Sequence, residues 1–89
     1  MNALIDGAAI ETREDLHDAL SAQLSLPDWY GRTLDALYDC LGDIRKTASV
    51  RVVHADTLTR RLGDYAVMLR CVLADAALEN EHLTIYWED

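Results

Sequence analysis

The stretch Val50-Arg51-Val52-Val53 predicts a β-strand in the middle of this chain of 89 residues, because three of its four residues are β-branched and apolar. A second strand is predicted at Ala3-Leu4-Ile5, which the turn-forming pair Asp6-Gly7 follows. A third is predicted over residues 83–87, where apolar side chains recur at every second position. The arrangement of the chain therefore depends on what connects these three strands.

The first connection, between residues 5 and 50, predicts two helices. Thr12 and Asp15 have the spacing of a capping box, and the helix that follows carries Leu16, Ala19, Leu20 and Leu24 on one face. Leu26-Pro27 ends it, because the residue before a proline is pushed out of the helical region, and residues 27–31 form a loop. Thr33 is the predicted N-cap of a second helix that runs to about Leu41 and stops at Gly42. Its predicted core side carries Leu34, Leu37 and Leu41.

The second connection, between residues 53 and 83, also predicts two helices. A short helix begins at Asp56 or Thr57 and stops near Gly63. Asp64 caps a longer helix, on which Tyr65, Leu69, Val72 and Ala76 share a face. Long helical connections favour parallel over antiparallel strands. The sequence therefore predicts an α/β fold, a small three-stranded parallel sheet packed with about four helices, in a single domain of residues 1–89.

Charge limits the partners that such a domain can have. The chain carries 16 acidic and eight basic residues, a formal charge of −8, which repels nucleic acid phosphates. Direct binding to nucleic acid is therefore not expected. The surplus keeps a protein soluble and also suits a partner with a basic surface, and composition does not choose between these two readings.

No segment predicts a membrane span or a signal peptide, because the N-terminal residues contain no basic region and only a short apolar run. A cytoplasmic protein with no membrane association is expected. Cys40 and Cys71 lie in apolar helical stretches without CxxC spacing, so two buried free thiols are expected. The three histidines stand alone and are expected to be surface or hydrogen-bonded polar residues. We therefore expect no cofactor and no bound metal.

The most unusual local feature is the stretch from Trp29 to Leu41, where two aromatic residues that we expect to be exposed, Trp29 and Tyr30, precede a helix with carboxylates four residues apart. Asp35 and Asp39 share one helical face, and Asp39 lies near the C-terminal end, where the helix dipole disfavours an anion. Asp75 and Glu79 repeat this spacing on the longer helix. Another carboxylate, that of Asp43, follows directly after Gly42. Three acidic clusters could face one partner.

Spacing alone is compatible with other interpretations of these carboxylates. The simplest is a solvated helix face next to aromatic residues that cover a core. A catalytic interpretation pairs Asp35 with Asp39 as acid and base, but such a pair needs a substrate cleft between the two groups, which one helix face of so small a domain does not provide. We therefore do not expect an enzyme.

A family resemblance favours a functional interpretation. The segments Leu26-Pro27, Trp29-Tyr30-Gly31, Leu34-Asp35-Ala36-Leu37 and Asp39-Cys40-Leu41 resemble the signature segment of the barstar family, intracellular inhibitors of the ribonuclease barnase. Ile5-Asp6-Gly7, Asp15-Leu16-His17 and Leu83-Thr84-Ile85 extend the resemblance more weakly over the whole chain. The resemblance implies a barnase-like, basic secreted ribonuclease as a 1:1 partner, blocked by the loop and the second helix.

The resemblance also implies roles for single residues. Asp35 and Asp39 match the two interface aspartates of the family, Trp29 falls at an interface tyrosine, and Gly31 matches a family glycine that allows close approach. Asp75 is the better match to an acidic interface position, and Glu79 is a looser one. The candidate partner-binding residues are Trp29, Tyr30, Gly31, Thr33, Asp35, Tyr38, Asp39, Gly42, Asp43, Asp75 and Glu79.

Four positions depart from the family pattern. Tyr38 replaces a tryptophan, Thr33 an asparagine, Arg32 an acidic residue, and Ile44 a second tryptophan. These changes leave the interface aspartates in place, but they fall at positions that determine which ribonuclease is bound. The alternative function is an acidic interaction or immunity module on the same fold, whose basic partner is not a ribonuclease.

Overall fold

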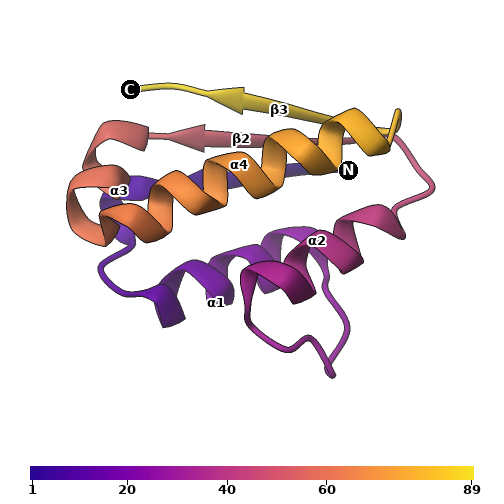
Figure 1. Ribbon diagram of the computed structural model, residues 1–89, viewed down its shortest axis with the longest axis horizontal. Coiled ribbons are helices and arrows are strands. Elements are labelled where there is room, and N and C mark those ends of the chain that lie inside the picture. Colours follow the sequence, from indigo (N-terminus) through magenta and orange to yellow (C-terminus); the bar gives the residue numbers. More distant parts are fainter.

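A computed structural model describes residues 1–89, and it confirms the predicted α/β fold class. Three parallel strands form one sheet in the order β1-β2-β3 (Figure 1). The elements in chain order are β1 (Asn2–Asp6), the 3-10 helix η1 (Gly7–Ala9), α1 (Arg13–Leu24), α2 (Leu34–Gly42), β2 (Ala48–Val53), α3 (Ala55–Leu62), α4 (Asp64–Glu79) and β3 (Leu83–Trp87).

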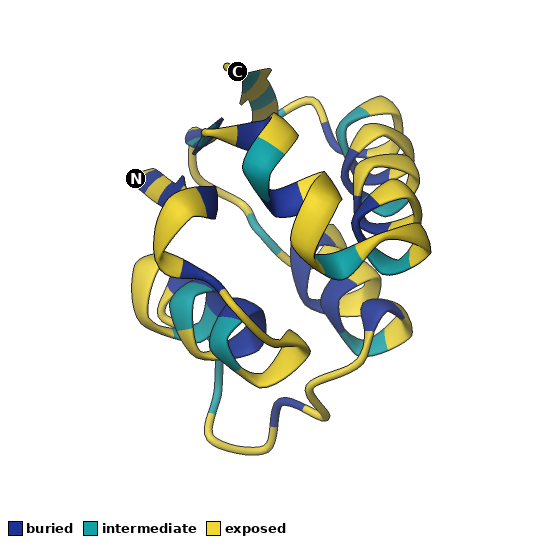
Figure 2. Cartoon of the chain, turned by 90° about the vertical axis from the view of Figure 1, so that its left-hand side faces the viewer, coloured by how far each residue is buried: buried dark blue, intermediate teal, exposed yellow.

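The helices cover one face of the sheet, and the other face is open to solvent (Figure 2). Strand pairing places Ala3 opposite Val50, and Val50 opposite Ile85, on the covered face. The neighbouring positions on the other face, Leu4 and Tyr86, are exposed. Two crossovers of the same hand that step in the same direction across a sheet put their helices on the same face. The strand order β1-β2-β3 therefore accounts for a parallel sheet that is covered on one side only.

The helix starts agree with the sequence prediction at two of four positions. Thr12 and Asp15 form the predicted capping box of α1, and the Thr33 hydroxyl accepts a hydrogen bond at the start of α2. The predicted start of α3 is wrong, because His54 in the left-handed conformation (φ 51°) lets the helix begin at Ala55. Asp64 is also not the cap that we predicted, since it is already the first residue of α4 and its side chain makes no capping bond.

The predicted core faces of α1 and α2 are confirmed apart from one half-buried position. Leu16, Leu20 and Leu24 are buried on α1, while Ala19 is partly exposed. All three predicted leucines of α2 are buried, and its helical bonds extend to Gly42, one residue past the expected end.

The core face of α4 is shifted from the predicted one. Ala66, Leu69, Leu73 and Ala76 are the buried residues, whereas Tyr65 and Val72 lie half-buried at the edges of this stripe. Because α4 is apolar on most sides, two stripes have helical spacing, and only packing against the sheet selects between them.

The uncertain choice of the buried face of α4 also led to the wrong prediction for one cysteine. Both cysteines are free thiols, but only Cys40 is buried, and the expectation of a buried Cys71 is wrong because that residue lies on the solvent side of α4.

None of the helices has the length and apolar character that crossing a membrane requires. No three His, Cys, Asp or Glu side chains are grouped so that they could hold a metal ion.

Candidate protein-binding site

Helix α2, which carries Asp35 and Asp39, is fixed at both ends by hydrogen bonds. At its start the Thr33 hydroxyl accepts a hydrogen bond from the Ala36 amide over 3.1 Å. At its end the Asn80 side-chain amide donates to the carbonyls of Leu41 and Ile44 over 2.9 and 3.0 Å. These bonds satisfy terminal groups that a helix cannot pair internally. Since Asn80 directly follows α4, the second contact also joins the C-terminal ends of α2 and α4.

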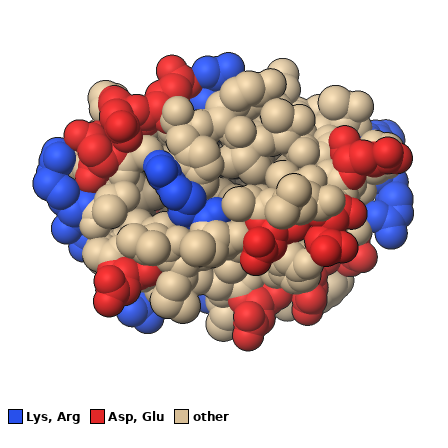
Figure 3. All heavy atoms as spheres, turned by 45° about the horizontal axis from the view of Figure 1, so that its top comes forward, with Lys and Arg blue, Asp and Glu red and all other residues tan.

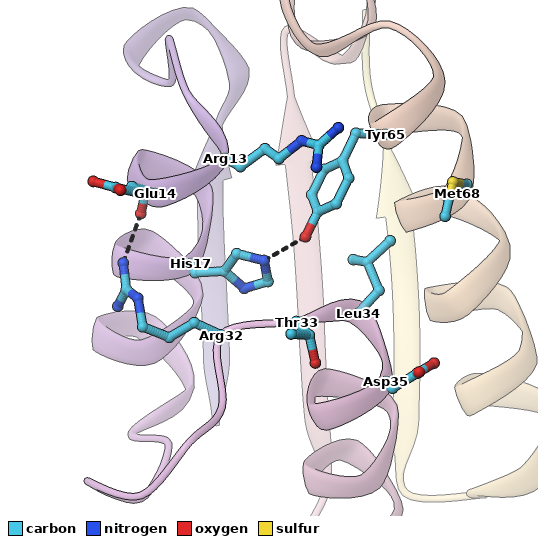
Figure 4. A pocket seen from close by; sticks show the side chains of 9 residues that line it. All are labelled: Arg13, Glu14, His17, Arg32, Thr33, Leu34, Asp35, Tyr65 and Met68. Carbon is cyan, nitrogen blue, oxygen red and sulfur yellow. Dashed lines mark hydrogen bonds between the residues drawn. The ribbon is translucent and has the colours of Figure 1, made fainter.

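Three surface hollows bring the predicted residues together from separate elements. A pocket of about 500 Å³ is lined by Thr33 and Asp35 together with Met68 of α4, and the Asp35 carboxylate points toward the α4 side (Figure 4). A hollow of about 220 Å³ joins Trp29 of the loop to Asp43.

The third hollow, of about 530 Å³, joins the end of α2 to the end of α4 through Gly42 and Glu79. Asp75 lies one helical turn before Glu79 on α4. We call the exposed candidate residues of the loop, α2 and the C-terminal half of α4 the acidic surface. It comprises the exposed residues Trp29, Gly31, Thr33, Asp35, Tyr38, Asp39, Gly42, Asp43, Asp75 and Glu79.

The carboxylates of the acidic surface form no ion pair within the molecule. The three ion pairs of the protein use Asp18, Glu88 and Asp56, none of which belongs to this surface. Figure 3 shows Asp and Glu side chains in several groups, with uncharged residues and some Lys and Arg side chains between them. Unpaired, exposed carboxylates at this density leave a negative potential that a cationic surface can satisfy.

This potential acts on the one thiol beneath the surface. Burial first, and then the negative charges of Asp43 and Asp39, raise the pKa of the Cys40 thiol. A thiol with a raised pKa is a weaker nucleophile. The buried side chain of Cys40 packs in the core.

Of the three aromatic residues predicted for the site, two are exposed and one is buried. Trp29 is 76% exposed, and Tyr38 on α2 is 37% exposed. Tyr30 is only 7% exposed, so the expectation of an exposed aromatic at this position is wrong. Its hydroxyl lies 2.6 Å from Nδ1 of the buried His17, and this bond turns the ring into the core.

The two glycines of the site have different surroundings. A Cβ atom added to Gly31 would lie 3.3 Å from the Ala36 Cβ, which is a tight contact. An added Cβ at Gly42 would meet no heavy atom within 4 Å. The absent side chain of Gly31 therefore also allows the loop to pack on α2, whereas that of Gly42 leaves open surface.

Four residues in or around the site have contacts or exposure that the sequence did not predict. Two are His17 and Asn80, whose partners lie far away in the chain. Arg32 adopts a left-handed conformation (φ 57°) and pairs with Asp18 on α1 over 2.7 Å. The fourth is Leu78, which is 85% exposed on the helical face of Asp75. Of these four residues, only Leu78 could have been placed from the sequence, because a residue three positions after Asp75 lies on the same face of a helix.

The fold and the site define a small α/β domain with an exposed acidic helix surface suited to binding a protein. Residues 1–88 match the family described as Barstar (barnase inhibitor), and the chain belongs to this family. Over 77 residues it is 58% identical to the Bacillus subtilis (strain 168) protein named "Putative ribonuclease inhibitor YrdF", and the match covers 85% of each chain. The resemblance inferred from the signature segment is thereby confirmed, and it indicates a barnase-inhibitor-like role, which is not that of an enzyme.

Proposed function

We propose that this protein is a cytoplasmic inhibitor of a basic secreted ribonuclease of the barnase type, which it binds 1:1. In this proposal the acidic surface covers the active site of the enzyme. The carboxylates of Asp35 and Asp39 occupy positions where RNA phosphates would otherwise bind and pair with active-site Arg, Lys or His side chains. The protein acts as a mimic of the substrate's charge and needs no cofactor.

The observation that carries the proposal is the set of exposed carboxylates without ion-pair partners on α2 and α4, in a chain of this family. In the free protein Asp35, Asp39 and Asp43 repel one another at successive turns, because like charges at this spacing destabilise a helix. A cationic partner would turn this repulsion into attraction across the interface.

The exposed aromatic residues complete the binding surface. Trp29 and Tyr38 are large amphipathic side chains next to the carboxylates, and residues of this type dominate binding energies at protein interfaces. They would exclude water from around the charge pairs. Tyr30 would contribute from below, by holding the loop, since its ring is buried.

The proposal is tested by inhibition of RNA cleavage with charge-neutral variants. The double variant Asp35→Asn/Asp39→Asn should lose most of its inhibition of a barnase-type ribonuclease and remain folded. The matched control is Asp89→Asn, which removes one carboxylate at the C-terminus, beyond β3 and away from α2 (Figure 1). Equal inhibition by the double variant and the wild type would contradict the proposed surface.

The same experiment addresses the alternative of an interaction or immunity module. A basic partner that is bound through Asp35 and Asp39, while no ribonuclease loses activity, would favour that alternative.

A further inference from the structure

The buried polar core of this protein lies directly behind the acidic surface. His17 of α1 is one of only two buried polar or charged residues, at 2% exposure. Its Nδ1 lies 2.6 Å from the hydroxyl of Tyr30 in the loop, and its Nε2 lies 2.6 Å from the hydroxyl of Tyr65 on α4. One imidazole ring therefore joins three separate segments of the chain, and Figure 4 shows it between α1 and Tyr65.

These contacts form a hydrogen-bonded chain. Whichever of its two tautomers a neutral His17 adopts, one ring nitrogen donates and the other accepts, so both tyrosine hydroxyls can be bonded at once. The Tyr30 hydroxyl also lies 3.5 Å from the Thr33 carbonyl oxygen, which is longer than an ordinary O–H···O bond. The chain runs from α4 through α1 and the loop to Thr33.

Thr33 is the residue at which this chain reaches the acidic surface. Its carbonyl also accepts the Leu37 amide over 2.9 Å, and its hydroxyl caps α2. Because Tyr30 lies between Trp29 and Gly31, the position of its ring fixes the backbone of both neighbours. Arg32, held to α1 by Asp18 and by the Glu14 carbonyl, restrains the same loop from the outside.

The rest of the loop has few restraints of its own. Among the backbone N–H groups of residues 26–33, two donate to backbone carbonyls, that of Leu26 to Ser21 and that of Tyr30 to Pro27. A segment with so few internal bonds opens easily unless side chains hold it. Binding energy would then be lost in ordering the loop.

We propose that His17, through Tyr30 and Tyr65, is a positioning residue that holds the loop and the start of α2 in the geometry needed for binding. The inference rests on the proposed function for its binding partner, but the order of the free loop can be tested without one. No atom of His17 touches the partner in this proposal. Its effect passes through Tyr30 to Trp29, Gly31 and Thr33.

The test compares two hydroxyl deletions and a ring replacement. Tyr65→Phe breaks the chain at its α4 end and is the mildest change, and His17→Gln replaces the central ring. Tyr86→Phe is the matched control, because it removes a tyrosine hydroxyl from the open face of the sheet. If His17→Gln does not fold, Tyr65→Phe alone decides.

Two measurements are made on each variant. The first is hydrogen exchange of the free protein, comparing the amides of residues 30–37 with those of β2. The second is the dissociation rate from a barnase-type ribonuclease. We expect roughly tenfold faster exchange at 30–37 with β2 protection retained, and roughly tenfold faster dissociation, as loss of a buried hydrogen bond implies. The control should leave both unchanged.

Other outcomes would overturn the inference. If exchange rises equally in β2 and at residues 30–37, the network stabilises the whole fold and does not order the loop in particular. If exchange is unchanged, the network does not order the loop at all. Faster loop exchange with an unchanged dissociation rate would remove its role in binding. If no ribonuclease binds the wild type, the proposed function fails separately, and exchange still decides whether His17 orders the loop.

Discussion

Replacement of Asp39 by alanine should move stability and binding in opposite directions. Asp39 is exposed in the C-terminal half of α2, without an ion pair, and Asp35 and Asp43 lie four residues before and after it. Its carboxylate is therefore unfavourable in the free helix. The Arg45 guanidinium donates to the Gly42 carbonyl at the end of α2 and offsets part of the helix-dipole penalty.

The stability change can be worked out from the two remaining effects. Alanine has a helix propensity better than that of aspartate by about 0.5–0.7 kcal/mol, and each like-charge pair at this spacing costs about 0.2–0.5 kcal/mol at low salt. Asp39→Ala should therefore raise the free energy of unfolding by about 1 kcal/mol. For a domain of this size that change raises the melting temperature by about 4–8 °C.

The binding change has the opposite sign and is larger. Truncating one member of a buried, hydrogen-bonded charge pair at an interface costs about 2–5 kcal/mol. Asp39→Ala should therefore weaken inhibition by a factor of about 30 to several thousand, at about 1.4 kcal/mol for each tenfold change. Asp35→Ala should also weaken inhibition but give little gain in stability, because Asp35 lies in the first turn of α2, where the dipole favours an anion.

Urea unfolding at low salt and titration of ribonuclease activity on the same preparations measure both effects. A less stable Asp39→Ala protein would show that the carboxylate has a structural role. Undiminished inhibition would show that the interface is misplaced. Either result would refute the reasoning, and Asp35→Ala is the internal comparison.

Association with a basic ribonuclease should slow as salt rises across the physiological range, where the Debye length is about 8 Å, and a stopped-flow rate that is indifferent to salt would contradict electrostatic steering. Replacing Cys40 and Cys71 by alanine should leave binding capacity intact at the cost of some core packing, and loss of the fold on mild reduction would reveal a bridge that we do not assign. Gly7→Ala should destabilise the protein strongly in urea, because the new Cβ would lie 2.3 Å from the His54 carbonyl oxygen, whereas Gly42→Ala, in open space, should not. Burial first, and then Arg32, lowers the pKa of His17 below 6.5, so the unfolded chain binds more protons than the folded one. Its contribution to stability should be present above pH 6.5 and lost as the pH falls below it, and an equal pH slope in His17→Gln would contradict this.

Features set by neighbouring residues could be predicted from the sequence. The caps at Thr12 and Thr33, the alternation along β3 and the shared face of Asp35 and Asp39 depend on spacings of a few residues, which local geometry determines. The two helical connections were sufficient to predict parallel strands, and the structure confirms them.

Features set by distant residues could not be predicted. The burial of Tyr30 depends on His17, 13 positions before it, and His17 in turn bonds Tyr65, 48 positions later. On α4, apolar residues surround most of the helix, so spacing did not separate Leu73 from Val72. The early start of α3 depends on a left-handed His54, for which no local pattern exists.

The central claim is that the acidic surface closes the active site of a ribonuclease. Its most direct test is a titration of RNA cleavage by a panel of basic, barnase-type ribonucleases with increasing amounts of the wild-type protein. We predict that at least one enzyme loses its activity linearly and completely at a molar ratio of one to one. Full activity of every enzyme at a large excess of the protein, including enzymes that it binds, would contradict the claim.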